Sequence, residues 1–265
     1  MLLNSVIIVV REALEAALMI SVLLALSRSL GIRTGWIGVA LLAGFLGAVL
    51  YGIELQQISD LFDGVGQEVV NASLQFCVFA MLLVCQFLAA QNPGIAPSRS
   101  VYLPAFMAAA VAFAVAREGS EILVYVSGFL HSQNFLATVG AGSLIGACIG
   151  LSVGVLLYYL LVSQPAGRCR PVAQVLICLV GAGMCAQATA LLIQADWLSV
   201  AGPVWDTSAW LPESSAIGQL LYALIGYEAS PSAPEVGVYL GSMLAMLAAF
   251  LLARFVRPES GDSAA

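Results

Sequence analysis

Residues 3–27, LNSVIIVVREALEAALMISVLLALS, form an apolar stretch with Arg11, Glu12 and Glu15 near its middle. A helix needs about 20 mainly apolar residues to cross a hydrocarbon core about 30 Å thick, so this stretch is long enough. Each charge at the centre of such a helix costs about 2.5 to 3.5 kcal/mol even on the most lenient insertion scale. Charged residues at this depth usually face a protein interior and usually have a function.

The composition extends this interpretation to the whole chain. Of the 265 residues, 61% are hydrophobic and 9% are charged, whereas soluble domains are about 45 to 50% apolar and about 25% charged. We therefore expect an all-α membrane protein with one transmembrane domain over residues 1–258 and a disordered cytoplasmic tail at 259–265. The predicted spanning segments are seven, at roughly residues 3–27, 35–55, 70–91, 101–130, 136–162, 172–195 and 236–256.

Charge is distributed unevenly between the predicted loops. The chain has no lysine and a net charge of −6, which excludes a basic nucleic-acid-binding surface. Short cytoplasmic loops accumulate arginine, which predicts an outside N-terminus and an inside C-terminus. The arginines on the inner side are Arg28, Arg33, Arg99, Arg168, Arg170, Arg254 and Arg257. The outer acidic residues are Glu54, Asp60, Asp63, Glu68, Asp196, Asp206, Glu213, Glu228 and Glu235. These acidic residues either concentrate cations or are solvated loop residues without a role.

The first charged motif has a second copy. REALEAALMIS at residues 11–21 aligns with REGSEILVYVS at residues 117–127, a shift of 106 residues. Three predicted spans lie from one motif to the next, so the two motif helices cross in opposite directions. This pattern predicts an inverted repeat, with one half at about 1–91, the other at about 101–195 and the last helix outside it. Transporters built in this way hold their substrate near the bilayer midplane, between the repeats.

Three further residue types are interpreted as structural. Gly142, Gly146, Gly150 and Gly154 recur every four residues and predict a smooth ridge for close helix packing. His131, the single histidine, is expected at a helix end as an interfacial side chain rather than a ligand. None of the cysteines forms a C-x-x-C pair, so we expect free thiols, either embedded in lipid or packed in the protein, rather than soft-metal ligands. The cysteines are Cys77, Cys85, Cys148, Cys169, Cys178 and Cys185.

The two motifs together form a candidate metal site. Glutamates three residues apart share a helix face, so the pair in each motif can converge on one point, and an arginine four residues away can orient one of them. Four carboxylates against two arginines leave about two negative charges. Oxygen donors suit hard cations, which leaves Fe(III), Mn(II), Mg(II) and Ca(II) open and Fe(II) acceptable. The candidate ligands are Glu12, Glu15, Glu118 and Glu121, with Arg11 and Arg117 as supporting residues.

Other interpretations of the motifs remain open from the residues alone. The motifs can be interhelical salt bridges that lock the bundle. The excess of acidic over basic residues argues against this, because such salt bridges need equal numbers of each. A di-iron enzyme in the membrane is a second alternative, but such sites ordinarily use Glu-x-x-His pairs, which this chain lacks. An ion sensor or scaffold protein would bind ions without moving them.

At these residues the chain resembles the high-affinity iron permeases of the oxidase-dependent iron and lead transporter family. That family's Arg-Glu-Gly-x-Glu signature matches residues 117–121 fully, while the first copy has Ala13 in place of glycine. The segment 204–240, VWDTSAWLPESSAIGQLLYALIGYEASPSAPEVGVYL, is similar to the family's outer segment. Within it we expect a surface helix at Ser214 to Ile225, packed by Leu220, Leu221 and Leu224. Trp197, Trp205 and Trp210 are expected as interfacial anchors.

The resemblance implies a function and a location. The four glutamates would bind iron as a transported substrate, with no resident cofactor and no enzymatic reaction, and the iron would enter the cytosol. The expected location is the lipid bilayer of a bacterial inner membrane rather than a eukaryotic plasma membrane. The resemblance also implies an extracytoplasmic ferroxidase or iron-delivery partner, leaves a homo-oligomer open, and keeps lead or manganese as alternative cargo.

Overall fold

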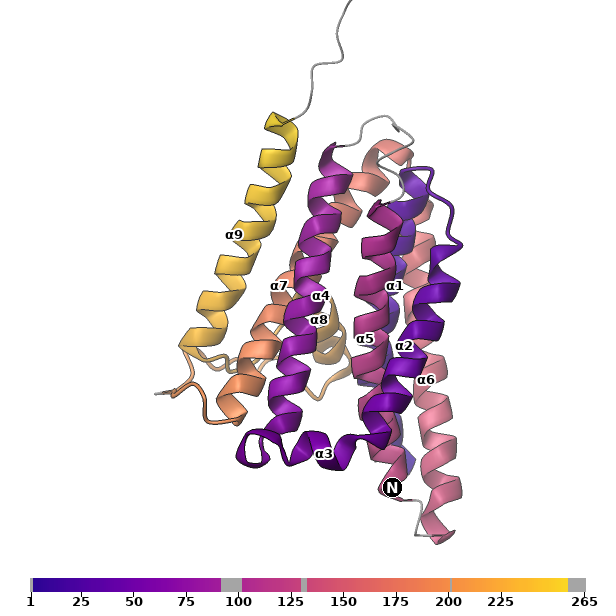
Figure 1. Ribbon diagram of the computed structural model, residues 1–265, viewed down its shortest axis with the longest axis vertical. Coiled ribbons are helices and arrows are strands. Elements are labelled where there is room, and N and C mark those ends of the chain that lie inside the picture. The colour runs from indigo at the N-terminus through magenta and orange to yellow at the C-terminus, as the bar shows by residue number, and fades with distance from the viewer. Residues whose placement is uncertain (1, 92–101, 130–132, 201, 257–265) are drawn as a thin grey trace, which may run out of the picture.

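The computed structural model describes residues 2–91, 102–129, 133–200 and 202–256, which form an all-helical bundle without a β-strand (Figure 1). The predicted all-α class is therefore confirmed. The elements in chain order are α1 (Leu2–Ser29), α2 (Trp36–Ile53), α3 (Leu55–Ser59), η1 (Leu61–Gly64), α4 (Gly66–Gln91), α5 (Tyr102–Ser127), α6 (Gln133–Val162), α7 (Ala166–Gln194), α8 (Ala216–Ile225) and α9 (Ala233–Phe255).

Five of these helices, α2, α4, α6, α7 and α9, are long and apolar enough to cross a membrane. The outer helices α2, α6 and α9 expose large apolar side chains such as Leu42, Leu144 and Leu244, each more than 60% exposed. Water would penalise such a continuous apolar surface, whereas lipid chains would not. The chain is therefore a multi-pass membrane protein. The two other long helices, α1 and α5, have 28 and 26 residues and carry the charged motifs.

Helix α1 lies inside the bundle, in contact with α5, α6, α7 and α8. It runs antiparallel to α5, which lies in front of it in Figure 1. Most of its side chains from Glu12 to Ser27 are buried. The charged motif of α1 is therefore enclosed by protein, as its high burial cost requires.

The predicted glycine ridge packs against α1, which confirms its structural interpretation. A Cβ atom at Gly146 would lie 2.7 Å from the carbonyl oxygen of Val6, and one at Gly150 would lie 2.6 Å from Cβ of Ala13. Ser21 also donates a 2.7 Å hydrogen bond to the carbonyl oxygen of Gly154. Only glycine permits this approach, so the ridge fixes how α1 sits on α6.

Helix boundaries agree with the predicted spans to within about four residues except at α7. The predicted break before this helix extended to residue 171, but the structure begins the helix at Ala166. The predicted span began at residue 172, directly after Pro171, so it left the first two turns of the helix in the preceding break. The proline lies in the second turn, where it removes one backbone donor near the helix start. Arg168 and Arg170 consequently lie within α7 rather than in a loop.

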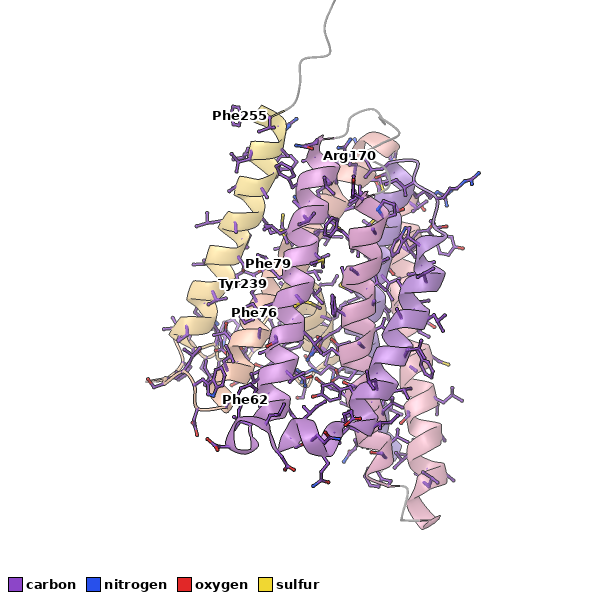
Figure 2. All side chains as sticks on the ribbon, in the orientation of Figure 1. Phe62, Phe76, Phe79, Arg170, Tyr239 and Phe255 are labelled. Carbon is purple, nitrogen blue, oxygen red and sulfur yellow. The ribbon has the colours of Figure 1, made fainter. Side chains whose placement is uncertain are left out.

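Charged residues outside the motifs segregate to the two ends of the bundle. Arg170 and Phe255, the last residue of α9, lie at one end and Phe62 of η1 lies at the other (Figure 2). Arg28, at the end of α1, lies at the same end as Arg170. The acidic residues that flank α3 or lie in η1 and the first turn of α4 are at the end that carries Phe62; they are Glu54, Asp60, Asp63 and Glu68. Arg99, Arg257 and His131 lie outside the described residues.

The segment between α7 and α9 covers part of the acidic end. Helix α8 begins at the predicted place, with Ser215 accepting a hydrogen bond from the backbone N–H of Gly218. Leu220 and Leu224 pack against the interior side chains of α1 as expected. Trp210 is almost fully exposed. All six cysteines are free thiols, which confirms their predicted state.

We expect that Gly146→Ala will lower the stability of the protein by about 1 to 3 kcal/mol, because its new methyl group overpacks the contact between α6 and α1. The matched control is Gly140→Ala in the same helix, where a Cβ meets no atom within 4 Å. Thermal unfolding in a mild detergent measures the difference. Equal transition temperatures for the two variants would contradict the assigned packing.

Glu228, which lies between α8 and α9, provides a pH-dependent prediction. Burial, then the charges of Glu235 and Glu213, raise the pKa of Glu228 from 4.5 to about 7. The folded state therefore keeps a proton that the unfolded state has lost between these pH values, and the resulting stability disappears as pH rises through about 7. The transition temperature should fall from pH 5 to pH 8, and Glu228→Gln should flatten this fall. An identical pH profile in the variant would refute the assignment.

Candidate metal site

Three buried carboxylates meet where α1 and α5 cross. Glu12 and Glu15 come from α1 and Glu118 comes from α5, and each offers one oxygen within 4.8 Å of the others. Oxygen ligands on opposite sides of a cation are about 4.2 to 4.8 Å apart when each metal–oxygen distance is about 2.1 to 2.4 Å. The three oxygens are thus already close to the spacing that one hard cation requires.

Arg117 joins this carboxylate cluster, which we define as Glu12, Glu15 and Glu118. Its Nη1 donates to Oε1 of Glu118 and lies 3.3 Å from Oε2 of Glu15. Its Nη2 lies 3.2 Å from Oε1 of Glu121. The guanidinium is nearly fully buried, so it relieves repulsion among carboxylates that water cannot solvate.

The remaining motif residues lie at the edge of the cluster. Glu121 pairs with Arg117 but is not one of the three converging carboxylates, and its side chain is 33% exposed. Arg11 lies 3.6 Å from Glu15 but is 46% exposed. Its guanidinium covers the ring of Tyr222 on α8, at 4.3 Å from the ring centroid. The structure therefore brings three of the four candidate ligands together and places the fourth on the far side of Arg117.

The cluster has buried oxygen atoms that accept no hydrogen bond from the described residues, although one of them, Oε1 of Glu15, lies 3.6 Å from Nε of Arg11. Oε2 of Glu12, Oε1 of Glu15 and Oε2 of Glu118 are all buried and have no hydrogen-bond partner. A buried polar atom left unpaired costs about 1 to 3 kcal/mol, and more when it is charged. Balanced salt bridges would not leave three carboxylates in this condition, whereas a bound cation would satisfy them together.

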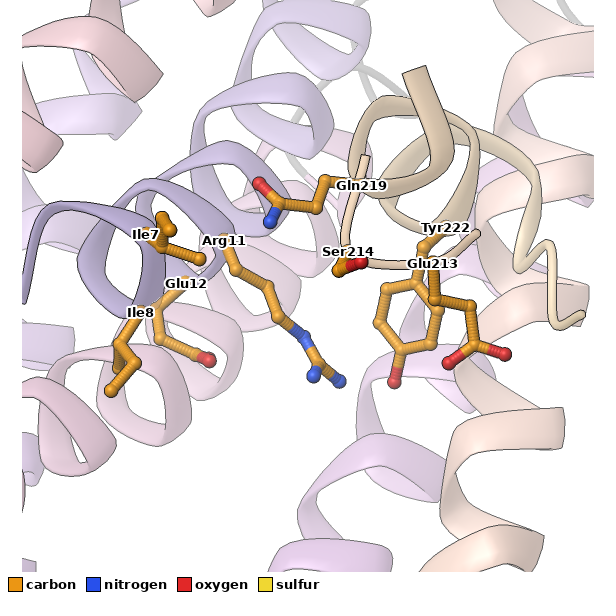
Figure 3. Close-up of a pocket in the computed structure, with 8 residues that line it drawn as sticks. All are labelled: Ile7, Ile8, Arg11, Glu12, Glu213, Ser214, Gln219 and Tyr222. Atoms are coloured by element: carbon orange, nitrogen blue, oxygen red, sulfur yellow. The ribbon is translucent and has the colours of Figure 1, made fainter. Parts of the chain in front are cut away.

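A pocket of about 430 Å³ reaches the cluster at Glu12. Arg11 extends across this pocket between Glu12 and Tyr222 (Figure 3). Glu213 lies beside Tyr222 and adds a second acidic group to the wall. The pocket thus leads from the acidic end of the bundle to one of the three carboxylates.

In the opposite direction the interior is closed. Between Glu15 and Leu26 all residues of α1 are apolar except Ser21, and facing side chains of α4 and α7 fill the remaining space. No room for a water molecule remains among these described side chains. The residues of this apolar plug are Met19, Val22, Leu23, Leu82, Ile177 and Val180.

Several polar residues near the site were not anticipated from the sequence. The sequence did not single out Tyr222, because an aromatic residue in a short amphipathic helix is indistinguishable by pattern from one that only packs. Asn71 and Gln75 interrupt the apolar face of α4 and could have been singled out. Asn71 Nδ2 lies 3.4 Å from Glu121, and Gln75 donates a 2.7 Å hydrogen bond to Gln187 of α7.

The fold and the cluster define a multi-pass helical membrane protein with a buried, acidic, cation-sized site. The chain belongs to the iron permease FTR1 family, whose model matches residues 89–259. The matched range includes the second charged motif but not the first.

Curated relatives extend the similarity to nearly the full chain. The ferrous iron permease EfeU of Escherichia coli O6:H1 is 30% identical over 275 aligned positions, which cover 97% of this chain and 96% of the relative. The ferrous iron permease EfeU of Yersinia pestis is 29% identical, with 92% of each chain covered. No solved structure matches this chain.

We expect Arg117→Met to destabilise the protein by about 3 to 5 kcal/mol, because it leaves buried carboxylates without their counter-charge. Arg11→Met removes an arginine of the same type from the partly exposed edge and should cost about 1 kcal/mol or less. Chemical or thermal unfolding in detergent compares the two variants. If Arg11→Met were the more damaging change, the central position of Arg117 would be wrong.

Proposed function

We propose that this chain carries iron ions across the membrane into the cytosol through the carboxylate cluster. The observation that carries the proposal is the convergence of three buried carboxylates at the spacing of one cation, each with an oxygen that accepts no hydrogen bond from the described residues. Membership of the iron permease family, together with relatives named as ferrous iron permeases, supports iron as the cargo and Fe(II) as its form. Iron is the substrate here, not a resident cofactor.

The charge of the site suits a divalent cation. Glu12, Glu15 and Glu118 are the proposed direct ligands, and Glu121 is a ligand at the edge of the path. With all four ionised, Arg117 and Arg11 reduce four negative charges to two. One Fe(II) then neutralises the site, which lowers the cost of holding it in a medium of low dielectric constant. In this proposal the arginines position the carboxylates and limit their repulsion.

The proposed architecture is seven spans arranged as a 3+3 inverted repeat plus α9. Helix packing supports this arrangement, because α1 packs on α6 and its counterpart α5 packs on α2. Likewise α1 contacts α7 while α5 contacts α4, and the pairs α1–α5 and α4–α7 each join equivalent helices. A two-fold relation between α1, α2, α4 and α5, α6, α7 would produce this set of contacts. Residues 1–258 then form one domain.

The proposed direction of transport follows the charge distribution. Short arginine-bearing segments belong on the cytosolic side, so the acidic end faces outwards and the N-terminus lies outside. A cation would approach the cluster through the pocket at Glu12. It would stay bound there in this conformation, because the apolar plug closes the route beyond Glu15. Rearrangement of one repeat against the other would open that route.

The bacterial relatives support a location in a bacterial inner membrane. An extracytoplasmic ferroxidase or delivery protein remains the proposed partner, acting at the acidic end. The chain itself is proposed to be a carrier and not an oxidase. A ferrous-iron-dependent consumption of oxygen by the purified protein would argue for the enzyme alternative.

Uptake of radioactive Fe(II) into liposomes that contain the purified protein tests the proposal. Glu118→Gln removes one ligand charge with little change of shape, and we expect it to lower initial uptake about tenfold or more, equivalent to at least about 1.4 kcal/mol. Adding Mn(II) or Pb(II) in excess measures whether either ion competes as cargo. Stronger competition by either ion than by unlabelled Fe(II) would reassign the substrate.

Asp60→Asn is the matched control, since it also exchanges an acid for an amide but lies on the exposed surface beside η1. Its uptake should equal that of the unchanged protein. The proposed site would be rejected if Glu118→Gln, reconstituted in equal amount, carried iron as fast as the control.

A further inference from the structure

We infer that a second pocket, lined by Tyr51, Glu68, Asn71 and Glu121, is a separate binding site for a partly hydrated divalent cation. The inference rests on the proposed function for its role, which is to supply ions to the carboxylate cluster from the side of Glu121, in addition to the pocket at Glu12. The chemistry of the pocket stands independently of that role.

The pocket lies between four helices at the acidic end of the bundle. Tyr51 comes from the last turns of α2, Glu68 and Asn71 from the start of α4, and Glu121 from the last turns of α5, with α7 closing the remaining side. Three separate helices therefore contribute these oxygen-bearing side chains to one pocket. We call it the outer pocket.

Asn71 provides the observation that points to a ligand. The residue is only 9% exposed and lines the outer pocket, and its Oδ1 atom accepts no hydrogen bond from the described part of the chain. Its Nδ2 lies 3.4 Å from Oε1 of Glu121, which holds the amide in this orientation. The hydroxyl of Tyr51 is also buried and has no hydrogen-bond partner among the described residues. Each such oxygen costs about 1 to 3 kcal/mol if nothing binds it.

The carboxylate of Glu121 faces the same space. Its contacts with Arg117 and Asn71 both use Oε1, and the side chain remains 33% exposed. Together with Glu68, it gives the outer pocket two carboxylates and two neutral oxygens. This donor set lacks sulfur and imidazole and is typical of hard divalent cations.

The size of the outer pocket determines the form of the ion. Its volume is about 410 Å³, whereas the six waters of a hydrated cation occupy about 180 Å³ at about 30 Å³ each. An ion can therefore enter with most of its water shell. The carboxylate cluster offers oxygens within 4.8 Å of one another, which leaves room only for a dehydrated ion.

Arg117 separates the two sites. Nη2 binds Glu121 at the outer pocket, while Nη1 binds Glu15 and Glu118 in the cluster. A cation bound by Glu121 competes with Arg117 for the same carboxylate. It therefore weakens the ion pair between Arg117 and Glu121. The outer pocket is thus placed to pass a cation inwards as its water is removed.

Binding of Mn(II) to the purified full-length protein in lipid nanodiscs tests this inference, with free Mn(II) measured by electron paramagnetic resonance. We expect two Mn(II) ions per chain. Glu68→Gln should raise the dissociation constant of one ion about tenfold and leave the other unchanged. Asn71→Asp should lower the dissociation constant of that same ion about tenfold, because it adds a third carboxylate. A purely structural role for Asn71 would not produce this gain.

Asp60→Asn again serves as the control, and its two dissociation constants should match those of the unchanged protein. A single bound Mn(II) in the unchanged protein, or unaltered binding in both Glu68→Gln and Asn71→Asp, would overturn the inference. If Mn(II) binding overturned the inference but Glu118→Gln still lost iron uptake, the proposed function would hold without the outer pocket. If Glu118→Gln kept normal uptake while Mn(II) binding shifted as expected, the outer pocket would hold without the proposed function.

Discussion

The structure depends on one buried arginine that holds carboxylates from two helices inside the bundle. Arg117 of α5 pairs with Glu118 of its own helix and with Glu15 of α1, and it extends to Glu121 at the edge. Unpaired, these charges would be too costly at this depth. The need to keep them paired fixes α1 against α5 and places the motif helices inside the bundle, with apolar helices around them.

Close packing of small residues gives this charged centre its rigidity. The glycines of α6 lie against the backbone of α1, and on the opposite side Gly44 and Gly47 of α2 lie against α5. Each motif helix is therefore supported by a helix from the other half of the chain. Such contacts resist small displacements, because closely packed backbones have no room to adjust by less than a shift of the whole helix. They set the angle at which the two motifs meet.

The two motifs are alike in sequence but not in environment. Arg117 is buried among carboxylates, whereas its counterpart Arg11 is partly exposed and lies over Tyr222 of α8. The segment that contains α8 packs only on the side of the first motif, so the two motifs have different surroundings. A pocket reaches the cluster at Glu12, and apolar side chains fill the interior towards the arginine-bearing end. The proposed transport starts from this asymmetric arrangement.

By itself, the sequence determined the helical class, the approximate position of each long helix, the glycine ridge and the residues of the buried motifs. These features depend on local hydropathy and on spacing along one helix, both of which are encoded within short segments. Only the tertiary structure decided that α7 begins before Pro171, that Arg117 rather than Arg11 occupies the centre, and that Glu121 faces a separate pocket with Asn71. The reason is that these features depend on the rotation and approach of helices distant in the chain, which no local pattern specifies.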